Sequence, residues 1–202
     1  MPEKQNVIIV GAGAVGFLTA LGLARQGIEV TILDAEQEVN ASPRAAVYYH
    51  TTLSILNKLG VADDAHAIGL PSTEFRMHWL ATGETMSSDM RETLEPGQEY
   101  DHNLHFGQHI LAELVMKHLA RLPHTQVLWG HKVTAMDQQA DGVTLTVETG
   151  DGVKQMAAHW VIGTDGARST MRRLMGLEFK GFTWPDRFVA TNIEYPFLEN
   201  GF

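Results

Sequence analysis

The chain contains no cysteine, and this absence excludes several classes of chemistry at once. Disulfide bridges, thiolate zinc sites, iron–sulfur clusters and cysteine nucleophiles all need the missing residue type. Basic residues are also few, because 15 Lys and Arg stand against 24 Asp and Glu, a formal net charge of −9. We therefore expect no nucleic-acid partner. The lack of cysteine fits a reducing compartment, and the expected location is cytoplasmic.

A long apolar run is also lacking. The uncharged stretch of residues 7–24 reaches only the lower length limit of a membrane-spanning helix. Four glycines interrupt it, alanine dilutes its apolar content, and an amphipathic strand follows at Glu29–Leu33. We therefore expect no membrane span and assign this stretch to a globular fold.

The first 33 residues have the pattern of a βαβ unit. Asn6–Val10 is a β-branched run typical of a strand buried in a parallel sheet. Residues 14–26 are good helix formers and stop at Gly27, and residues 28–33 form a second apolar run. This order predicts two parallel strands joined by a right-handed helical crossover.

The middle of the chain alternates helices with antiparallel strands. Helices are predicted at residues 51–59 and 108–122, and the second is the longest amphipathic segment. Residues 73–80 and 84–90 flank a glycine turn, which predicts a β-hairpin apart from the parallel sheet. Four short runs then predict a β-meander, at residues 127–129, 132–137, 143–148 and 153–158.

The last part of the chain returns to an apolar strand at Trp160–Gly163. Ser169 is placed to cap a short helix that runs to Met175 and stops at Gly176. A further strand is predicted at residues 188–195.

A glycine motif lies between the first strand and the first helix: Gly11-Ala12-Gly13-Ala14-Val15-Gly16. Gly11 permits a tight turn, Gly13 lets a pyrophosphate approach the helix N-terminus, and Gly16 lets the helix pack closely on the strand. Asp34, at the end of the second strand, is placed to accept hydrogen bonds from ribose hydroxyls. Such glycines also occur in ordinary turns, but the surrounding strand, helix and acid favour a dinucleotide site, either NAD or FAD.

Three further stretches are more specific: Pro43-Arg44-Ala45, Gly107-Gln108 at the start of the long helix, and residues 163–172 around Asp165-Gly166. Together with the glycine motif, and in the same order, they resemble the FAD-dependent aromatic hydroxylases of the p-hydroxybenzoate hydroxylase type, the group A flavoprotein monooxygenases. In that family an arginine after the second strand reaches the cofactor, and the Asp-Gly fingerprint is associated with FAD and reduced nicotinamide.

The resemblance implies an α/β, Rossmann-like FAD/NAD(P)-binding fold with a parallel sheet, a β-meander and the beginning of a β-sheet substrate domain. It implies FAD as cofactor and NADH or NADPH as co-substrate. With the glycine motif, the implied cofactor-binding residues are Gly11, Gly13, Ala14, Val15, Gly16, Asp34, Arg44, Ala45, Gln108, Val133, Asp165 and Gly166. No catalytic residue is assigned, and no metal site is expected.

The implied activity is that of an NAD(P)H-dependent monooxygenase acting on a phenolic or heteroaromatic substrate. In the family, reduced FAD reacts with oxygen to form a C4a-hydroperoxide, whose distal oxygen is transferred to the aromatic ring. The expected partners are therefore a small aromatic substrate and molecular oxygen, with a homodimer as a further option.

The chain departs from the family in two respects. The acid of the second strand is usually Glu followed by a basic residue, whereas here it is Asp34 followed by Ala35. Family members are considerably longer and carry a downstream Gly-Asp motif, which Gly150-Asp151 does not supply because it is a hairpin turn. We interpret the chain as the N-terminal half of a hydroxylase. Its expected parts are FAD-binding segments 1–72 and 105–178, a hairpin segment 73–104 on the substrate side, and the start of a substrate domain at 179–202.

Two other functions stay open at this point. One is a flavin-binding fragment without activity that needs a partner chain. The other is an NAD-dependent dehydrogenase, which Asp34 favours but the Asp-Gly motif and the missing Tyr-x-x-x-Lys pattern oppose. His102, His105 and His109 have the spacing of a helical metal site, but the residues between them interrupt a helix, which favours a loop.

Overall fold

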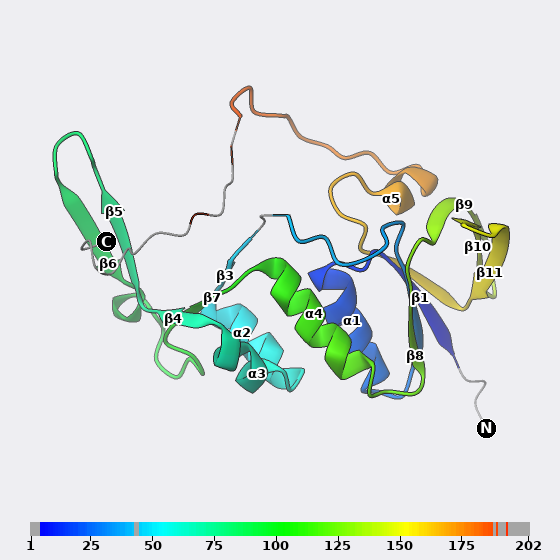
Figure 1. Ribbon diagram of the computed structural model, residues 1–202, viewed down its shortest axis with the longest axis horizontal. Coiled ribbons are helices and arrows are strands. Elements are labelled where there is room, and N and C mark those ends of the chain that lie inside the picture. Colours follow the sequence, from blue (N-terminus) through cyan, green and yellow to red (C-terminus); the bar gives the residue numbers. More distant parts are fainter. Residues whose placement is uncertain (1–4, 43–44, 188, 190–192, 194–202) are drawn as a thin grey trace.

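A computed structural model describes residues 5–42, 45–187, 189 and 193 of the chain. Its centre is a parallel sheet with the strand order β12-β1-β2-β8 (Figure 1). These strands are β1 (Asn6–Val10), β2 (Glu29–Leu33), β8 (Thr125–Leu128) and β12 (Trp160–Gly163). The predicted βαβ unit is confirmed, because α1 (Ala14–Ala24) joins β1 to β2 and Val7 pairs with Val30 in parallel register.

The sheet is buried on both faces, as the continuous apolar run of β1 requires. Ile9 and Ile32 face α1 and pack with Phe17, which has no exposed surface. Ile8 and Leu33 face the opposite way and belong to a second apolar cluster. Each such side chain contributes about 1.5–3 kcal/mol through burial, so the sheet is held between two apolar layers.

Helix α4 (Gln108–Leu119) packs beside α1 on the first face of the sheet (Figure 1). It begins at the predicted residue and ends three residues earlier than predicted, at Leu119 rather than residue 122. Leu111, Val115 and Leu119 are buried at helical spacing and join the cluster around Phe17. The apolar stripe seen in the sequence is therefore the face that α4 turns toward α1 and the sheet.

A three-stranded antiparallel meander covers the other face, with β9 (Lys132–Gln138), β10 (Val143–Thr149) and β11 (Gly152–Ala158) in consecutive pairing. The prediction that residues 127–129 begin this meander is wrong. Residues 127 and 128 belong to β8, which pairs in parallel with β2, so that Val127 stands opposite Ile32. The physical reason is that β8 follows helix α4 across the sheet, and a helical crossover leads into a parallel strand.

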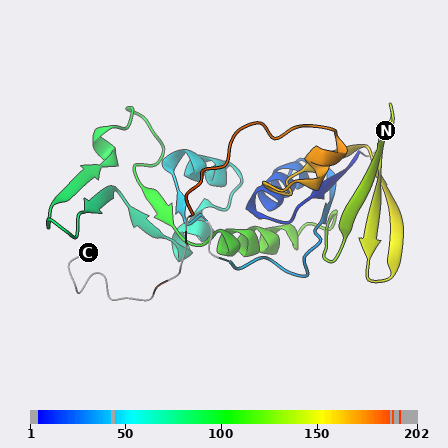
Figure 2. The same cartoon turned by 90° about the horizontal axis from the view of Figure 1, so that it is seen from above.

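The predicted hairpin is confirmed as β5 (Glu74–His78) and β6 (Thr85–Asp89), with Gly83 at a φ of +75° in the turn. It stands at the end of the elongated molecule opposite the meander in both cartoon views (Figures 1 and 2). Between it and the helices lies a small antiparallel sheet of β3 (Val47–Tyr48), β7 (Asn103–His105) and β4 (Leu70–Ser72).

Two helices adjoin this small sheet, α2 (His50–Lys58) and α3 (Ala62–Ile68). The first matches the prediction for residues 51–59, whereas α3 and the strands β3, β4 and β7 were not predicted. Tyr48 stacks on Phe106 with ring centroids 4.4 Å apart, and Leu104 is fully buried below them. These residues continue the same apolar cluster that contains α1 and α4.

The three histidines considered as a metal site are spread over different elements. His105 lies in β7, His109 in α4, and His102 in the loop before β7, where its Nε2 atom is 2.9 Å from that of His66. Within the described ranges, no group of three His, Cys, Asp or Glu residues is arranged to hold a metal ion.

The described residues also form two short helical turns, η1 (Met90–Glu92) directly after β6 and α5 (Thr170–Leu174) after β12. Ser169 caps α5 as predicted, because its hydroxyl accepts a hydrogen bond from the Arg172 amide at 2.9 Å. The strand predicted at residues 188–195 lies outside the described residues except for positions 189 and 193. In the part of the chain that the structure covers, no helix has the length and apolar character to cross a membrane.

The Tyr48 hydroxyl supplies a test of this packing. It is buried with no hydrogen-bond partner among the described residues, and burial raises the pKa of Tyr48 to about 12. Removing an unsatisfied buried hydroxyl relieves its desolvation penalty, so Tyr48→Phe should raise the free energy of unfolding by about 1 kcal/mol in urea denaturation. Tyr49→Phe is the control, since Tyr49 is exposed. A loss of stability in Tyr48→Phe would contradict this account of the core.

Candidate functional site

A cavity of about 430 Å³ opens where the carboxyl ends of β1 and β2 meet the N-termini of α1 and α4. Ligands of parallel α/β sheets bind at this edge, because the strand ends and helix N-termini leave polar backbone groups there. The cavity brings together nine of the residues predicted from the sequence: Gly11, Gly13, Ala14, Val15, Asp34, Gln108, Val133, Asp165 and Gly166.

Three predicted residues are placed otherwise. Gly16 is buried outside the cavity wall, and a Cβ atom there would overlap the Gly11 carbonyl oxygen. Ala45 is exposed and is not among the described residues that line the cavity. Arg44 lies outside the described residues.

The outer and middle glycines of the motif have different roles. Gly11 has a φ of +111°, and a Cβ atom there would lie 2.6 Å from the Thr164 carbonyl oxygen. Gly13 has an ordinary φ of −83°, and a Cβ atom there would meet nothing within 4 Å. The fold therefore requires glycine at position 11, whereas at position 13 the missing side chain only leaves open space in front of α1.

The cavity wall includes the start of two helices. Gly13 and Gly107 are the N-cap residues of α1 and α4, and the described structure shows no side-chain cap hydrogen bond and no first-turn acid at either end. The first amides of each helix have no partner inside the helix, and the helix dipoles add partial positive charge. This arrangement is suited to an anionic group such as a diphosphate.

Asp34 is held at the end of β2 by two backbone amides. Its Oδ2 atom accepts a hydrogen bond from the Ala12 amide at 2.6 Å, and its Oδ1 atom accepts one from the Glu36 amide at 2.9 Å. An ionised carboxylate has about four acceptor positions, so capacity for further donors remains. Asp34 thus both fixes the glycine turn and presents acceptors at the cavity wall.

The wall beyond Asp34 is joined to the turn between β8 and β9. The His131 amide donates to the Asp34 carbonyl oxygen at 2.7 Å, and the Gly130 amide donates to the Glu36 carbonyl oxygen at 2.7 Å. These two bonds bring Val133, which is 5% exposed, to the cavity. An apolar side chain there provides a surface for an uncharged ring next to the carboxylate of Asp34.

Asp165 lines the cavity, but its carboxylate serves α5. Its Oδ1 atom accepts a hydrogen bond from the Ser169 hydroxyl at 2.6 Å, and its Oδ2 atom accepts from the Thr170 amide at 2.6 Å and the Met171 amide at 3.1 Å. Asp165 therefore holds the residue that caps α5 as well as the first two amides of that helix. Gly166 follows with a φ of +77°, which turns the chain at the cavity wall.

Several cavity residues are not among the twelve cofactor-binding residues predicted from the sequence. Lys132 and Arg168 add positive charge, Glu36 and Glu38 add negative charge, and Thr164 joins the wall from the end of β12. Lys132 directly precedes Val133 and Thr164 directly precedes Asp165, so adjacency to a predicted residue was the one available signal.

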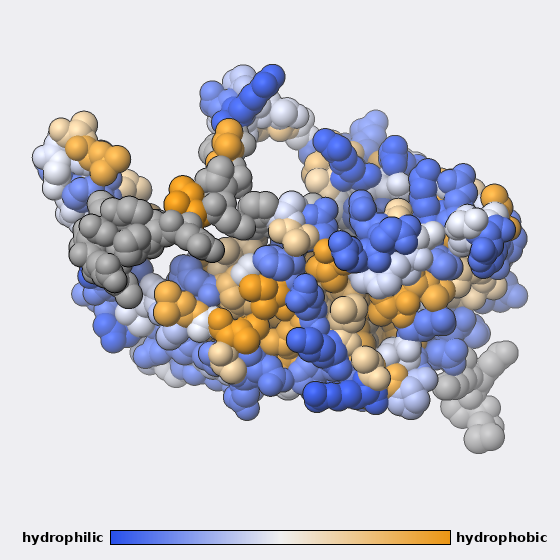
Figure 3. All heavy atoms as spheres, in the orientation of Figure 1, coloured by the Kyte–Doolittle hydropathy of each residue, from blue (hydrophilic) through white to orange (hydrophobic). Residues whose placement is uncertain are grey.

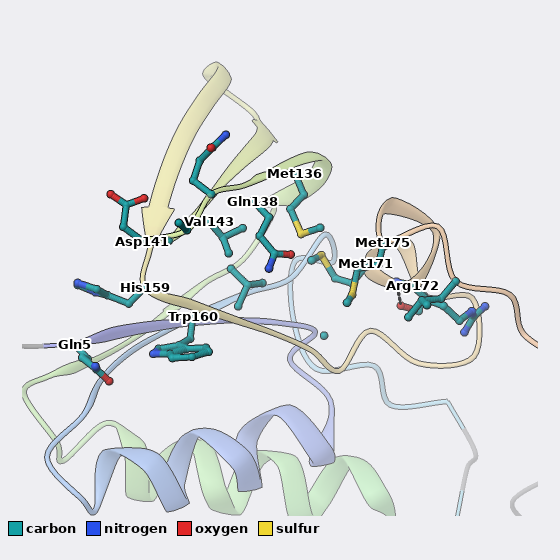
Figure 4. A pocket seen from close by; sticks show the side chains of 17 residues that line it. Gln5, Met136, Gln138, Asp141, Val143, His159, Trp160, Met171, Arg172 and Met175 are labelled. Carbon is teal, nitrogen blue, oxygen red and sulfur yellow. Dashed lines mark hydrogen bonds between the residues drawn. The ribbon is translucent and has the colours of Figure 1, made fainter.

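A second cavity, of about 530 Å³, lies between the meander and β12 (Figure 4). Met136, Val143, Met171 and Met175 give it an apolar wall, and Trp160 projects from β12 along its floor (Figure 4). None of the twelve predicted residues lines it in the described part of the chain. The first cavity, with its helix N-termini and fixed carboxylate, is therefore the candidate site.

Comparison with known proteins places this architecture in a family. A family model described as an FAD binding domain matches residues 4–199, and the chain belongs to that family. The chain is 36% identical over 204 residues to para-nitrophenol 4-monooxygenase of Pseudomonas sp. strain WBC-3. It is 39% identical over 203 residues to 6-hydroxy-3-succinoylpyridine 3-monooxygenase of Pseudomonas putida strain DSM 28022 / S16.

These matches cover 100% of this chain but 50% and 51% of the two relatives, so the chain spans about half the length of the curated relatives it matches. The crystal structure of p-nitrophenol 4-monooxygenase from Pseudomonas putida DLL-E4 has a TM-score of 0.85 at 36% identity, and the match covers 91% of this chain and 46% of that one. The resemblance to FAD-dependent aromatic monooxygenases and the Rossmann-like α/β fold are thereby confirmed.

The different roles of the two glycines can be tested without any ligand. Gly11→Ala combines a strained φ with a backbone clash, so we expect it to lower the free energy of unfolding by about 2 kcal/mol or more. Gly13→Ala meets no atom and should change it by less than about 1 kcal/mol. Chemical denaturation of both variants measures the difference. Equal losses at the two positions would contradict the assignment of Gly13 to ligand access.

Proposed function

We propose that this chain is the FAD-binding portion of a monooxygenase that hydroxylates a phenolic or heteroaromatic substrate, with NADH or NADPH as electron donor. The observation that carries this proposal is the cavity where the open face of Gly13, the uncapped start of α1 and the fixed carboxylate of Asp34 meet. FAD bound there supplies the chemistry that activates oxygen, which no amino-acid side chain can perform.

The residues present fit the parts of FAD. The amides at residues 13–15, together with the start of α4 at Gln108, would hold the diphosphate, since they offer unpaired donors and positive dipole ends. Asp34 would accept hydrogen bonds from the adenosine ribose, and Val133 would lie beside the adenine. Gly166 and the backbone at Ala45, with Arg44, would serve the flavin end. Asp165 would act through its backbone, because its side chain caps α5.

The charge around the cavity is balanced in a way that suits a diphosphate. Lys132 and Arg168 add positive charge to the two helix dipoles, although Lys132 also pairs with Glu148 at 3.3 Å. Glu36 and Glu38 line the same end of the cavity as Asp34, where we expect the ribose hydroxyls of FAD rather than its phosphates. The net charge of −9 is therefore no obstacle to an anionic cofactor.

The division into segments is part of the same proposal. Residues 1–72 and 105–178 would form the FAD-binding part, whereas 73–104 and 179–202 would belong to the substrate side. Support comes from the hairpin, whose Phe75, Met77 and Met86 share one face and are exposed, as are Trp79 and Leu80 beside its turn. The space-filling view shows apolar side chains at the free end of the hairpin (Figure 3). Molecular oxygen, a small aromatic substrate and a homodimer are the partners proposed for the whole protein.

A flavin-binding fragment without activity is the second candidate, because the chain spans about half of its relatives and the cavity serves mainly the adenosine and diphosphate. Adding NADH or NADPH to the FAD-loaded chain, with a panel of phenolic and heteroaromatic acids, separates the two. Substrate-stimulated consumption supports the monooxygenase portion, and bound FAD without consumption supports the silent fragment.

Gly13→Val tests the proposed diphosphate position. The valine side chain would occupy the space in front of α1, so the dissociation constant for FAD should rise at least tenfold while the urea unfolding curve stays close to that of the wild type. Quenching of flavin fluorescence measures the affinity, with NAD titrated in parallel. Gly150→Val is the matched control, because a Cβ there also meets nothing within 4 Å and the site is a distant turn. Unchanged FAD affinity in Gly13→Val would remove α1 from the proposed site.

A further inference from the structure

We propose that Thr164 is a positioning residue for the cofactor: its hydroxyl ties the glycine turn after β1 to the loop after β12. This inference rests on the proposed function, because it states that Thr164 fixes the distance between two walls of the cavity proposed to bind FAD. The glycine turn is defined as residues 11–16 and the Asp-Gly loop as residues 164–168.

Thr164 bonds to the end of β1 through both its backbone and its side chain. Its amide donates to the Val10 carbonyl oxygen at 2.8 Å, and its Oγ1 atom lies 3.0 Å from that oxygen and 2.9 Å from the Gly11 carbonyl oxygen. A hydroxyl has one hydrogen to donate. The Thr164 amide donates to the Val10 carbonyl oxygen, so the hydroxyl is the group that links Thr164 to the Gly11 carbonyl oxygen.

The two outer glycines of the motif make room for this contact. A Cβ atom on Gly11 would lie 2.6 Å from the Thr164 carbonyl oxygen, and a Cβ atom on Gly16 would lie 2.9 Å from the Thr164 hydroxyl. Gly11 and Gly16 are buried, whereas Gly13 is exposed and faces open space. The outer glycines therefore serve the contact with Thr164, and the middle glycine serves the ligand.

The contact has a direct consequence for the cavity. One wall is formed by residues 11–15 and the facing wall by residues 164–166, so the Thr164 hydroxyl lies at the seam between them. Amides that bind a diphosphate gain affinity when they are held in place before the ligand arrives. Loss of the hydroxyl leaves the bond to Val10 and the bond from the Ala12 amide to Asp34, but it removes the restraint on the Gly11 carbonyl oxygen. The amides at the start of α1 are then less well ordered.

The test compares Thr164→Val with a matched control, Thr125→Val. The Thr125 Oγ1 atom also lies within hydrogen-bond distance of two backbone carbonyl oxygens, those of Leu119 at 2.8 Å and Leu122 at 2.9 Å, but it lies outside the cavity. Both variants should lose some stability in urea. Thr164→Val alone should raise the FAD dissociation constant, by about fivefold to tenfold, or about 1 kcal/mol, and Thr164→Ser should restore it. Thr164→Ala removes the hydroxyl with less bulk and should repeat the result.

A second readout needs no cofactor. Hydrogen exchange of the amides at residues 10–16 should be faster in the ligand-free Thr164→Val chain than in the wild type, and unchanged in Thr125→Val. Exchange at wild-type rates in Thr164→Val would overturn the proposed role of the Thr164 hydroxyl. An equal rise in the FAD dissociation constant in both variants would overturn it as well. If the wild-type chain does not bind FAD, the proposed function fails, whereas the exchange measurement still decides the role of Thr164.

Discussion

The structure depends on the close approach of two backbones at the carboxyl ends of β1 and β12. Gly11 makes this approach possible, because its missing side chain leaves the space that the Thr164–Asp165 peptide occupies. The same contact fixes the turn from which α1 starts, so that the first turn of α1 faces the cavity, and it brings the loop after β12 to the opposite wall. A side chain at position 11 would clash with the Thr164–Asp165 peptide and push the two strand ends apart.

The layers of the fold keep these strand ends in place. Because β1 is buried on both faces, α1 and α4 on one side and the meander on the other resist any displacement of its end. Asp34 adds a polar restraint, since it accepts hydrogen bonds from Ala12 and Glu36 and its own carbonyl oxygen accepts one from His131. The shape of the cavity therefore depends on the apolar packing below it as well as on the groups that line it.

The parts that were predicted from the sequence are those with local signals. The start of α4 at Gln108, the hairpin around Gly83 and the cap at Ser169 each depend on neighbouring residues, and the structure agrees with them. The strand at residues 127–129 was placed in the wrong sheet, because three apolar residues do not encode which strand they pair with. The strands β3, β4 and β7 are two or three residues long, too short to show a period. The contact between Thr164 and Gly11 was not predicted, because the two residues lie 153 positions apart along the chain.

The most direct test of the central claim is a visible absorption spectrum of the purified chain, recorded after FAD has been added and the excess removed. If the cavity at the ends of β1 and β12 is an FAD site, the chain retains flavin in proportion to protein, and the flavin bands are shifted from those of free FAD. A folded chain that stays colourless after this treatment would contradict the assignment of the cavity to FAD.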